Sequence, residues 1–283
     1  MAIALSPISE NIGAKVRGID MSVVPDGETA AALNRAVADH CILVFENQDV
    51  TPEQHIAFTK ALGDVAYAPG LDRYLHPDHP EIFMVANRDK DGKPLETLNT
   101  GRQWHSDQSF MPRPAMGSIL HCKEIPPFGG TTMFANMFRA YETLSPAFQA
   151  MIDGLKAVHY VYALRDFANR PPPTEEEKAK VPPTAHPMVR THPVTGRKAL
   201  YVSEMLTTHI DGMTEEESAA ILRYLFDHSV RPEFTYRHHW RPNDVVFWDN
   251  RCTMHYAPPD YDLSDPANRR VMYRTTIEGD APF

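Results

Sequence analysis

The sequence predicts a mostly β protein with a few flanking helices, and three observations indicate this class. Short apolar runs recur along the chain without the regular alternation of strand and helix that a parallel sheet needs. Proline accounts for 25 of 283 residues, about 9% where about 5% is usual, which suits short strands and irregular loops. The sequence contains neither a glycine-rich phosphate loop nor a serine nucleophile elbow. These features favour an antiparallel double-sheet barrel over a doubly wound fold.

Each expected strand is a short apolar run between turn-forming residues. In the first part of the chain we expect strands at residues 14–18, 41–45, 82–86, 104–110, 117–122, 132–136 and 156–162. In the second part we expect them at residues 189–192, 198–202, 234–239, 245–248 and 270–277. The first two of these flank the turn at residues 193–196 and are predicted to form a hairpin.

Capping residues predict four helix starts, at Asp26, Thr51, Ser145 and Thr214. Gln or Glu follows Thr51 and Thr214 three residues later, which is the spacing of a capping box. The helix after Thr51 is expected to end near Leu62. Residues 165–187 are rich in proline and acidic side chains, and we expect them to form a lid or a mobile loop.

Composition restricts the class of partner and the location of the protein. The chain has 28 Lys and Arg against 37 Asp and Glu, a net charge of −9, so neither nucleic acid nor a membrane is an expected partner. It has no apolar stretch of the roughly 18 residues that span a membrane and no signal-peptide pattern, so we expect a cytoplasmic protein. Its three cysteines form no CxxC pair and are expected to be buried free thiols. Without a repeat or a clear linker, residues 1–283 are expected to form a single domain.

The segment Trp104-His105-Ser106-Asp107 is the first candidate site. On a strand, His105 and Asp107 would point to the same face, because side chains alternate with a period of two. With a second histidine they could form a two-histidine, one-carboxylate triad that leaves three metal positions open. Taken alone, the pattern is explained equally well by a hydrogen bond between His105 and Asp107.

The C-terminal part of the chain supplies a second histidine and a pair of arginines. An apolar run at residues 245–248 leads through a polar turn to His255, and Arg270 follows 15 residues later. On a strand, Arg270 and Arg274 would share a face and could point into one cavity. Two buried guanidiniums are costly unless each meets an anion, whereas a solvated basic edge strand is the alternative explanation.

Together these motifs resemble the Fe(II)/α-ketoglutarate-dependent taurine dioxygenase and aryloxyacetate dioxygenase family, and the resemblance covers nearly the whole chain. It implies a jelly-roll double-stranded β-helix in which His105, Asp107 and His255 are the iron ligands. Thr132 and Arg270 match the groups that hold the distal carboxylate of α-ketoglutarate (2-oxoglutarate), and Trp248 matches an aromatic residue near the metal pocket, although a core tryptophan explains it equally. The resemblance implies that Arg274 meets an anionic group of the substrate. Asn99, in a segment before Trp104 that departs from the taurine-enzyme pattern, is a further candidate for a polar substrate contact.

The resemblance implies that oxidative decarboxylation of α-ketoglutarate to succinate and CO2, with O2 as co-substrate, is coupled to hydroxylation of a small organic anion. A taurine-like sulfonate or an alkyl sulfate is the expected substrate, and an aryloxyalkanoate or another carboxylate is the alternative. Family members are often oligomers, so a homo-oligomer is expected. Two other classes remain open, a non-catalytic jelly-roll binding protein and a zinc hydrolase, although no glutamate stands in an HExxH-like position.

Overall fold

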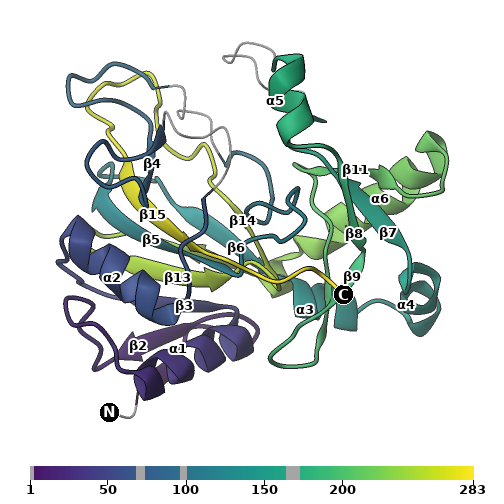
Figure 1. Ribbon diagram of the computed structural model, residues 1–283, viewed down its shortest axis with the longest axis horizontal. Coiled ribbons are helices and arrows are strands. Elements are labelled where there is room, and N and C mark those ends of the chain that lie inside the picture. Colours follow the sequence, from purple (N-terminus) through teal and green to yellow (C-terminus); the bar gives the residue numbers. More distant parts are fainter. Residues whose placement is uncertain (1–2, 68–73, 96–100, 164–172) are drawn as a thin grey trace.

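The computed structural model describes residues 3–67, 74–95, 101–163 and 173–283, and its largest element is a seven-stranded sheet (Figure 1). In spatial order its strands are β1 (Ala4–Pro7), β2 (Ala14–Arg17), β3 (Ile42–Phe45), β13 (Val245–Asp249), β5 (Gly117–Glu124), β15 (Val271–Ile277) and β4 (Phe83–Ala86). The pairings are antiparallel except for the parallel pair β2–β3. Strands from the two ends of the chain are therefore neighbours at the centre of this sheet.

A three-stranded antiparallel sheet faces the large one. Its strands, in spatial order, are β12 (Thr235–His238), β6 (Thr132–Asn136) and β14 (Thr253–Tyr256). Leu120 and Val246 from the large sheet share one apolar core with Phe134 and Met254 from the small sheet. The site described below lies at this junction, since His255 is in β14 and Ser118 is in β5.

Two helices cover the other face of the large sheet, α1 (Gly27–His40) and α2 (Pro52–Leu62) (Figure 1). Leu33 of α1 and Phe58 of α2 pack with Leu43 and Phe247 of the sheet in a second apolar core. Both helices begin as predicted, because Asp26 accepts a hydrogen bond from the N–H of Thr29 and Thr51 forms a complete capping box.

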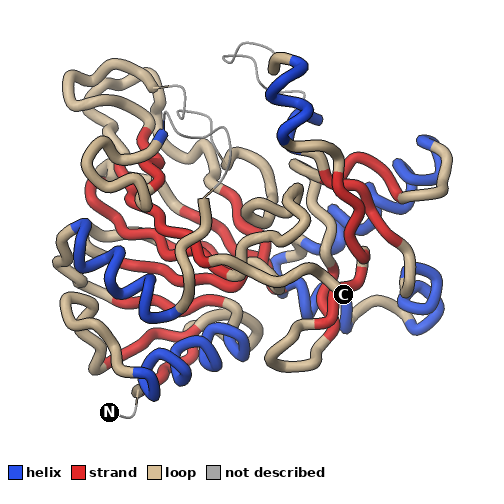
Figure 2. Tube along the Cα trace, in the orientation of Figure 1, coloured by secondary structure: helices blue, strands red, loops and turns tan. Residues whose placement is uncertain are grey.

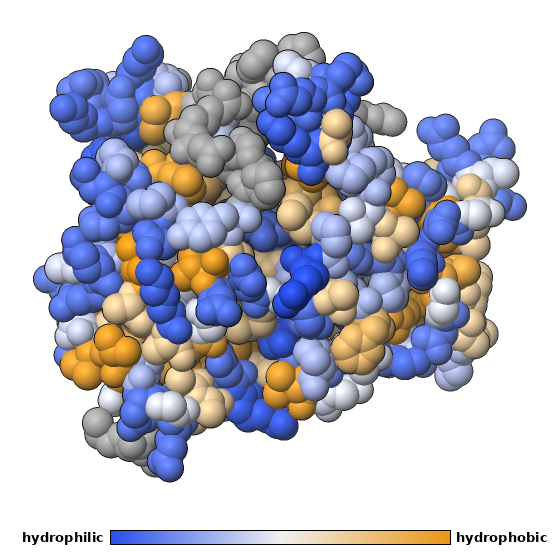
Figure 3. Space-filling view, in the orientation of Figure 1, coloured by the Kyte–Doolittle hydropathy of each residue, from blue (hydrophilic) through white to orange (hydrophobic). Residues whose placement is uncertain are grey.

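The remaining elements lie to one side of these layers (Figure 2). A second three-stranded sheet has the order β11 (Thr207–Ile210), β7 (Lys156–His159), β8 (Thr184–Pro187), and β9 (Val189–Thr191) pairs with β10 (Lys198–Leu200) in the predicted hairpin. The helices here are α3 (Met137–Glu142), α4 (Pro146–Ile152) and α6 (Glu215–Ser229), with 3₁₀ turns at Val161–Ala163 and Pro232–Phe234. Helix α5 (Glu175–Lys180) buries no residue and forms the hydrophilic projection at the top of Figure 3.

Most predicted strands are confirmed to within two residues, one is absent and one is shorter than predicted. Residues 104–110 form no strand: His105 makes an isolated bridge and turns follow it. Part of the segment expected to be a lid or a mobile loop, residues 165–187, has regular structure, because Thr174 caps α5 and β8 pairs with β7. Residues 165–172 lie outside the described residues. The strand expected to reach residue 162 ends at His159. Strands β1, β8, β11 and β14 and helices α3 and α5 are additional to the predicted elements.

The cysteines and the helices give two further results. Cys41, Cys122 and Cys252 are free and buried, as predicted. Within the part of the chain that the structure describes, no helix combines the length and the apolar character needed to cross a membrane.

Candidate metal centre

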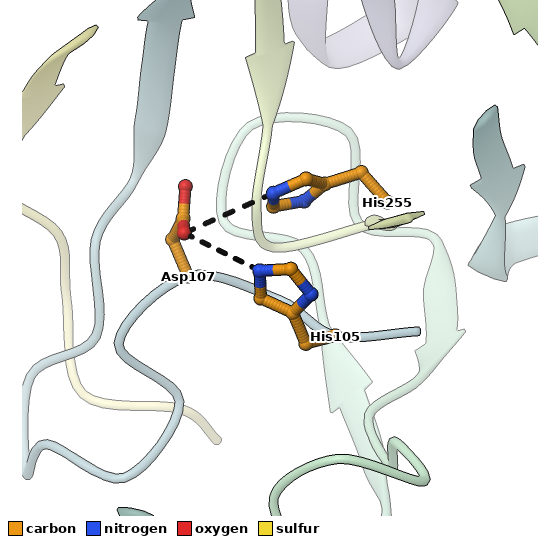
Figure 4. Close-up of side chains that lie close together, drawn as sticks. All are labelled: His105, Asp107 and His255. Carbon is orange, nitrogen blue, oxygen red and sulfur yellow. Dashed lines mark ion pairs between the residues drawn. The ribbon is translucent and has the colours of Figure 1, made fainter. Parts of the chain in front are cut away.

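The structure brings His105, Asp107 and His255 together, although His255 follows the other two by about 150 residues. One possible ligand atom from each residue lies within 4.8 Å of the others, and all three side chains are buried. The Nε2 atoms of His105 and His255 lie 3.8 and 3.9 Å from Oδ1 of Asp107 (Figure 4). Three donors from two separate segments therefore converge on one small volume.

The backbone sets this convergence through a single isolated bridge. His105 N–H donates to His255 O at 3.1 Å, and His255 N–H donates to His105 O at 2.8 Å. This exchange places the two imidazole rings side by side, with centroids 4.1 Å apart. Asp107 lies in the turn after the bridge, so the strand alternation from which the pairing of His105 with Asp107 was predicted is wrong.

The protonation of the three groups suits a divalent cation. Nδ1 of His105 lies 2.8 Å from Gln103 O and is its donor, which leaves the lone pair of Nε2 free. Burial lowers the pKa of both imidazoles, so both are neutral at pH 7. Burial alone would raise the pKa of Asp107, but the positive charge of Arg274, together with the neighbouring imidazoles and the hydrogen bond from Ser118, outweighs it and holds that pKa below its usual value. Two neutral imidazoles and one carboxylate are the donor set of a non-haem Fe(II) site.

A second cluster, His192, Asp249 and Cys252, also has three possible ligand atoms within 4.8 Å of one another. Here a guanidinium already supplies the positive charge. Arg251 donates to both carboxylate oxygens of Asp249, from Nε at 2.9 Å and from Nη2 at 2.6 Å, and His192 Nε2 lies 3.0 Å from Oδ2. We therefore assign this cluster to folding stability. At Asp107, in contrast, Arg274 donates only from Nη1 and only to Oδ1.

Thr132 and Arg270 lie together, as the resemblance implies. Arg270 donates from Nη2 to Thr132 Oγ1 at 3.2 Å and from Nε to Gly130 O at 3.0 Å, and Trp240 Nε1 also donates to Thr132 Oγ1. Arg270 is buried, yet both of its acceptors are uncharged, and no carboxylate among the described residues forms an ion pair with it. A buried guanidinium without a counter-charge is costly, so this position suits an anionic ligand.

The other predicted site residues have different surroundings. Arg274 donates from Nη1 to Asp107 Oδ1 at 2.7 Å, lies 4.7 Å above the ring of Phe83, and has a buried Nε without a hydrogen-bond partner. The ring of Trp248 lies 4.7 Å from that of His255, and its Nε1 donates to Asn250. Asn99 lies outside the described residues. The roles predicted for these three residues stay predictions.

Two polar residues at the site are additional to the predicted ones. Ser118 Oγ donates to Asp107 Oδ2, and Asn250 contacts both Ser118 and the backbone of Asp107. Asn250 carries a sequence signal, since it lies in the polar turn between Trp248 and His255. Ser118 carries none, because a single serine in an apolar strand is common.

Comparison with known proteins gives the family. The model of the taurine catabolism dioxygenase TauD, TfdA family matches residues 4–276. The alpha-ketoglutarate-dependent 2,4-dichlorophenoxyacetate dioxygenase of Cupriavidus pinatubonensis is 31% identical over 98% of this chain and 99% of its own. The alpha-ketoglutarate-dependent sulfate ester dioxygenase of Pseudomonas putida is 30% identical over 100% of this chain and 91% of its own. The crystal structure of AAD-2 in complex with Mn(II) and N-oxalylglycine has 35% identity and a TM-score of 0.86, and covers 100% of this chain and 98% of that one. The chain therefore belongs to the TauD, TfdA family.

Its enzyme class follows from the family together with the buried triad. The chain is an α-ketoglutarate-dependent dioxygenase, a class that uses Fe(II) as cofactor and α-ketoglutarate and O2 as co-substrates. The donors around Asp107 suit Fe(II), and the buried cation at Arg270 suits a carboxylate.

Proposed function

We propose that His105, Asp107 and His255 hold Fe(II), and that Arg270 and Thr132 hold the distal carboxylate of α-ketoglutarate. The unpaired buried guanidinium of Arg270 is the observation that carries this assignment. Bound Fe(II) supplies O2 activation, which couples the decarboxylation of α-ketoglutarate to succinate and CO2 with hydroxylation of a substrate C–H bond. The role of Trp248 in this proposal is to pack against the ring of His255 beside the cofactor.

Charge balance supports the placement of α-ketoglutarate. Fe(II) with the single carboxylate of Asp107 has a net charge of +1, and α-ketoglutarate brings two negative charges. One carboxylate is balanced at the metal, and the other needs a separate cation within the buried site. Arg270 is that cation, and the hydroxyl of Thr132, which already accepts from Trp240, remains able to donate to the same carboxylate.

The substrate is proposed to be a small organic anion whose charged group meets Arg274. Among the described residues, the buried Nε of Arg274 has no hydrogen-bond partner, and Phe83 stacks against its guanidinium and restricts its orientation. A taurine-like sulfonate or an alkyl sulfate is the first candidate, with Asn99 as a further polar contact. An aryloxyalkanoate or another carboxylate is the second, and relatives named for 2,4-dichlorophenoxyacetate and for sulfate esters support keeping both.

The proposal also covers the architecture of the protein, its location and its assembly. We infer that the sheets β1-β2-β3-β13-β5-β15-β4 and β12-β6-β14 are the two layers of a jelly roll, since both contribute to one core. Residues 1–283 are proposed to form a single domain, in which the segment around residues 165–187 contains a lid or a mobile loop. The protein is further proposed to be cytoplasmic, to form a homo-oligomer, and to bind neither nucleic acid nor membranes.

The test is O2 consumption by protein loaded anaerobically with Fe(II), with and without α-ketoglutarate, against a panel of anions. The panel contains taurine, longer alkyl sulfonates, alkyl sulfates, phenoxyacetate and phenoxypropionates. Stimulation by one class, with stoichiometric succinate and sulfite, aldehyde or phenol, would support the proposal and identify the substrate. Slow succinate formation without stimulation would keep the reaction and reject these anions. Without any Fe(II)-dependent turnover, a binding protein or a zinc hydrolase would replace the proposal.

A further inference from the structure

The carboxylate of Asp107 is held at both of its oxygens. Oδ1 faces the two imidazole nitrogens and accepts a 2.7 Å hydrogen bond from Nη1 of Arg274, and Oδ2 accepts a 2.7 Å hydrogen bond from Oγ of Ser118. Ser118 is fully buried in β5, where it pairs with Trp248 of β13. A hydroxyl has a single proton, so this hydrogen bond commits it to Asp107. Whatever fixes the hydroxyl of Ser118 therefore also fixes the position of Oδ2, on the side of the carboxylate opposite Arg274.

The side-chain amide of Asn250 fixes that hydroxyl. Its Nδ2 donates to Ser118 Oγ at 3.0 Å. Its Oδ1 accepts from Trp248 Nε1 at 2.8 Å and from the backbone N–H of Asp107 at 3.2 Å. Two N–H donors converge on this one atom, and an N–H donor needs an oxygen opposite it, so the amide can be placed only one way round. The orientation of Asn250 is thus fixed by groups that cannot accept a hydrogen bond.

The backbone beside Asp107 is held to the same turn. Ser106 Oγ contacts Asn250 O at 2.6 Å and Thr253 O at 2.7 Å, and all three residues are buried. Because the segment with His105 and Asp107 has only one bridge and no strand ladder, these side-chain bonds replace the backbone bonds that would otherwise define it. The polar turn after β13 therefore determines where the ligand segment lies.

We propose that Asn250 and Ser118 are positioning residues of the metal centre and act in series on Asp107. Trp248 and the Asp107 backbone orient the amide of Asn250, the amide orients the hydroxyl of Ser118, and the hydroxyl holds Oδ2 so that Oδ1 faces the imidazoles. The inference rests on the metal centre of the proposed function. Partners of this kind orient a ligand, and their loss typically weakens metal binding by about 10- to 100-fold.

The test measures Co(II) binding to the full-length protein by calorimetry and by the visible absorption of the bound ion. Ser118→Ala removes only the hydroxyl, and Asn250→Leu keeps the shape of the side chain without its polar atoms. Ser203→Ala is the matched control, because Ser203 is also buried but its hydroxyl has no hydrogen-bond partner within the described residues. We expect Ser118→Ala and Asn250→Leu to raise the Co(II) Kd about 10- to 100-fold and to shift the absorption spectrum, with Ser203→Ala unchanged.

A combined variant tests whether the two residues act in series. Adding Ser118→Ala to Asn250→Leu should weaken Co(II) binding by much less than Ser118→Ala does alone. If Asn250→Leu does not fold, Ser118→Ala decides the question by itself. An unchanged Kd and spectrum in folded Ser118→Ala, with normal binding by the wild type, would overturn this inference and leave the proposed function intact. A wild type that does not bind Co(II) would overturn the proposed metal centre, and this inference with it.

Discussion

Two buried arginines allow one substitution to separate binding from stability. Arg270 and Arg251 are equally exposed, at 7% each, but their surroundings differ. Arg251 forms two hydrogen bonds with the carboxylate of Asp249, whereas Arg270 donates only to uncharged oxygens. Replacing each with methionine removes the charge and keeps most of the volume of the side chain. The Arg270 variant should therefore lose ligand binding, whereas the Arg251 variant should lose stability.

For Arg270→Met we expect loss of α-ketoglutarate binding with little loss of stability. A hydrogen bond that involves a charged group contributes about 1.5–3 kcal/mol, so a guanidinium that forms two such bonds with a carboxylate contributes at least about 3 kcal/mol. That energy corresponds to a Kd raised about 100-fold or more. In the absence of α-ketoglutarate, removing an uncompensated buried charge should leave the free energy of unfolding unchanged or raise it.

For Arg251→Met we expect a large loss of stability instead. Removing one partner of a buried ion pair leaves the carboxylate of Asp249 uncompensated, which costs about 3–5 kcal/mol. Calorimetry with Mn(II)-loaded protein measures α-ketoglutarate binding without turnover, and urea unfolding of the metal-free protein measures stability. An unchanged α-ketoglutarate Kd in Arg270→Met, or a loss of stability as large as that of Arg251→Met, would refute the assignment of Arg270 to the cofactor.

Three further predictions concern the metal, the substrate and pH. Asp107→Ala should abolish turnover and leave the far-UV circular dichroism spectrum unchanged, since it removes one of three ligands; full retained activity would exclude Asp107 from the site. Arg274→Ala should raise the KM of the substrate far more than that of α-ketoglutarate, and the opposite pattern would exchange the roles of the two arginines. Burial lowers the pKa of His55 to about 3, so between about pH 6.5 and 3 the unfolded chain binds a proton that the folded chain does not. Stability should therefore fall as pH falls from 6.5 to 4.5, by about 1.4 kcal/mol per pH unit for each such imidazole, and a flat urea midpoint over this range would contradict the burial of a neutral His55.

Local signals predicted most of the secondary structure because they act within a few residues. Capping boxes at Thr51 and Thr214 and the apolar runs of β3 and β13 depend on their own segments, and the structure has them where they were expected. Residues 104–110 were predicted wrongly, although their apolar and polar pattern suits a strand. Within the described residues, no strand pairs with this segment beyond the single bridge at His105. Secondary structure there is decided by contacts with a turn more than 140 residues away, which no local pattern contains.

The residues of the site could be predicted from the sequence, but the side chains that surround each of them could not. The family resemblance predicted His105, Asp107 and His255 as metal ligands, and the structure brings the three residues together. Sequence could not distinguish the environments of Arg251 and Arg270, because whether a buried guanidinium is paired depends on the side chains that face it. Asp249 faces Arg251, and Gly130 O and Thr132 face Arg270.

The two arginines show how the fold separates stability from function near one metal centre. At Asp249 a carboxylate, a guanidinium and an imidazole satisfy one another, so the turn after β13 is fixed before any ligand binds. That turn contains Asn250, which holds Asp107 through hydrogen bonds with the Asp107 backbone and with Ser118. Arg270, in contrast, has hydrogen bonds that hold its position and no charge that neutralises it. A rigid, unneutralised cation is pre-organised for an anion, since little side-chain entropy remains to be lost when the anion binds.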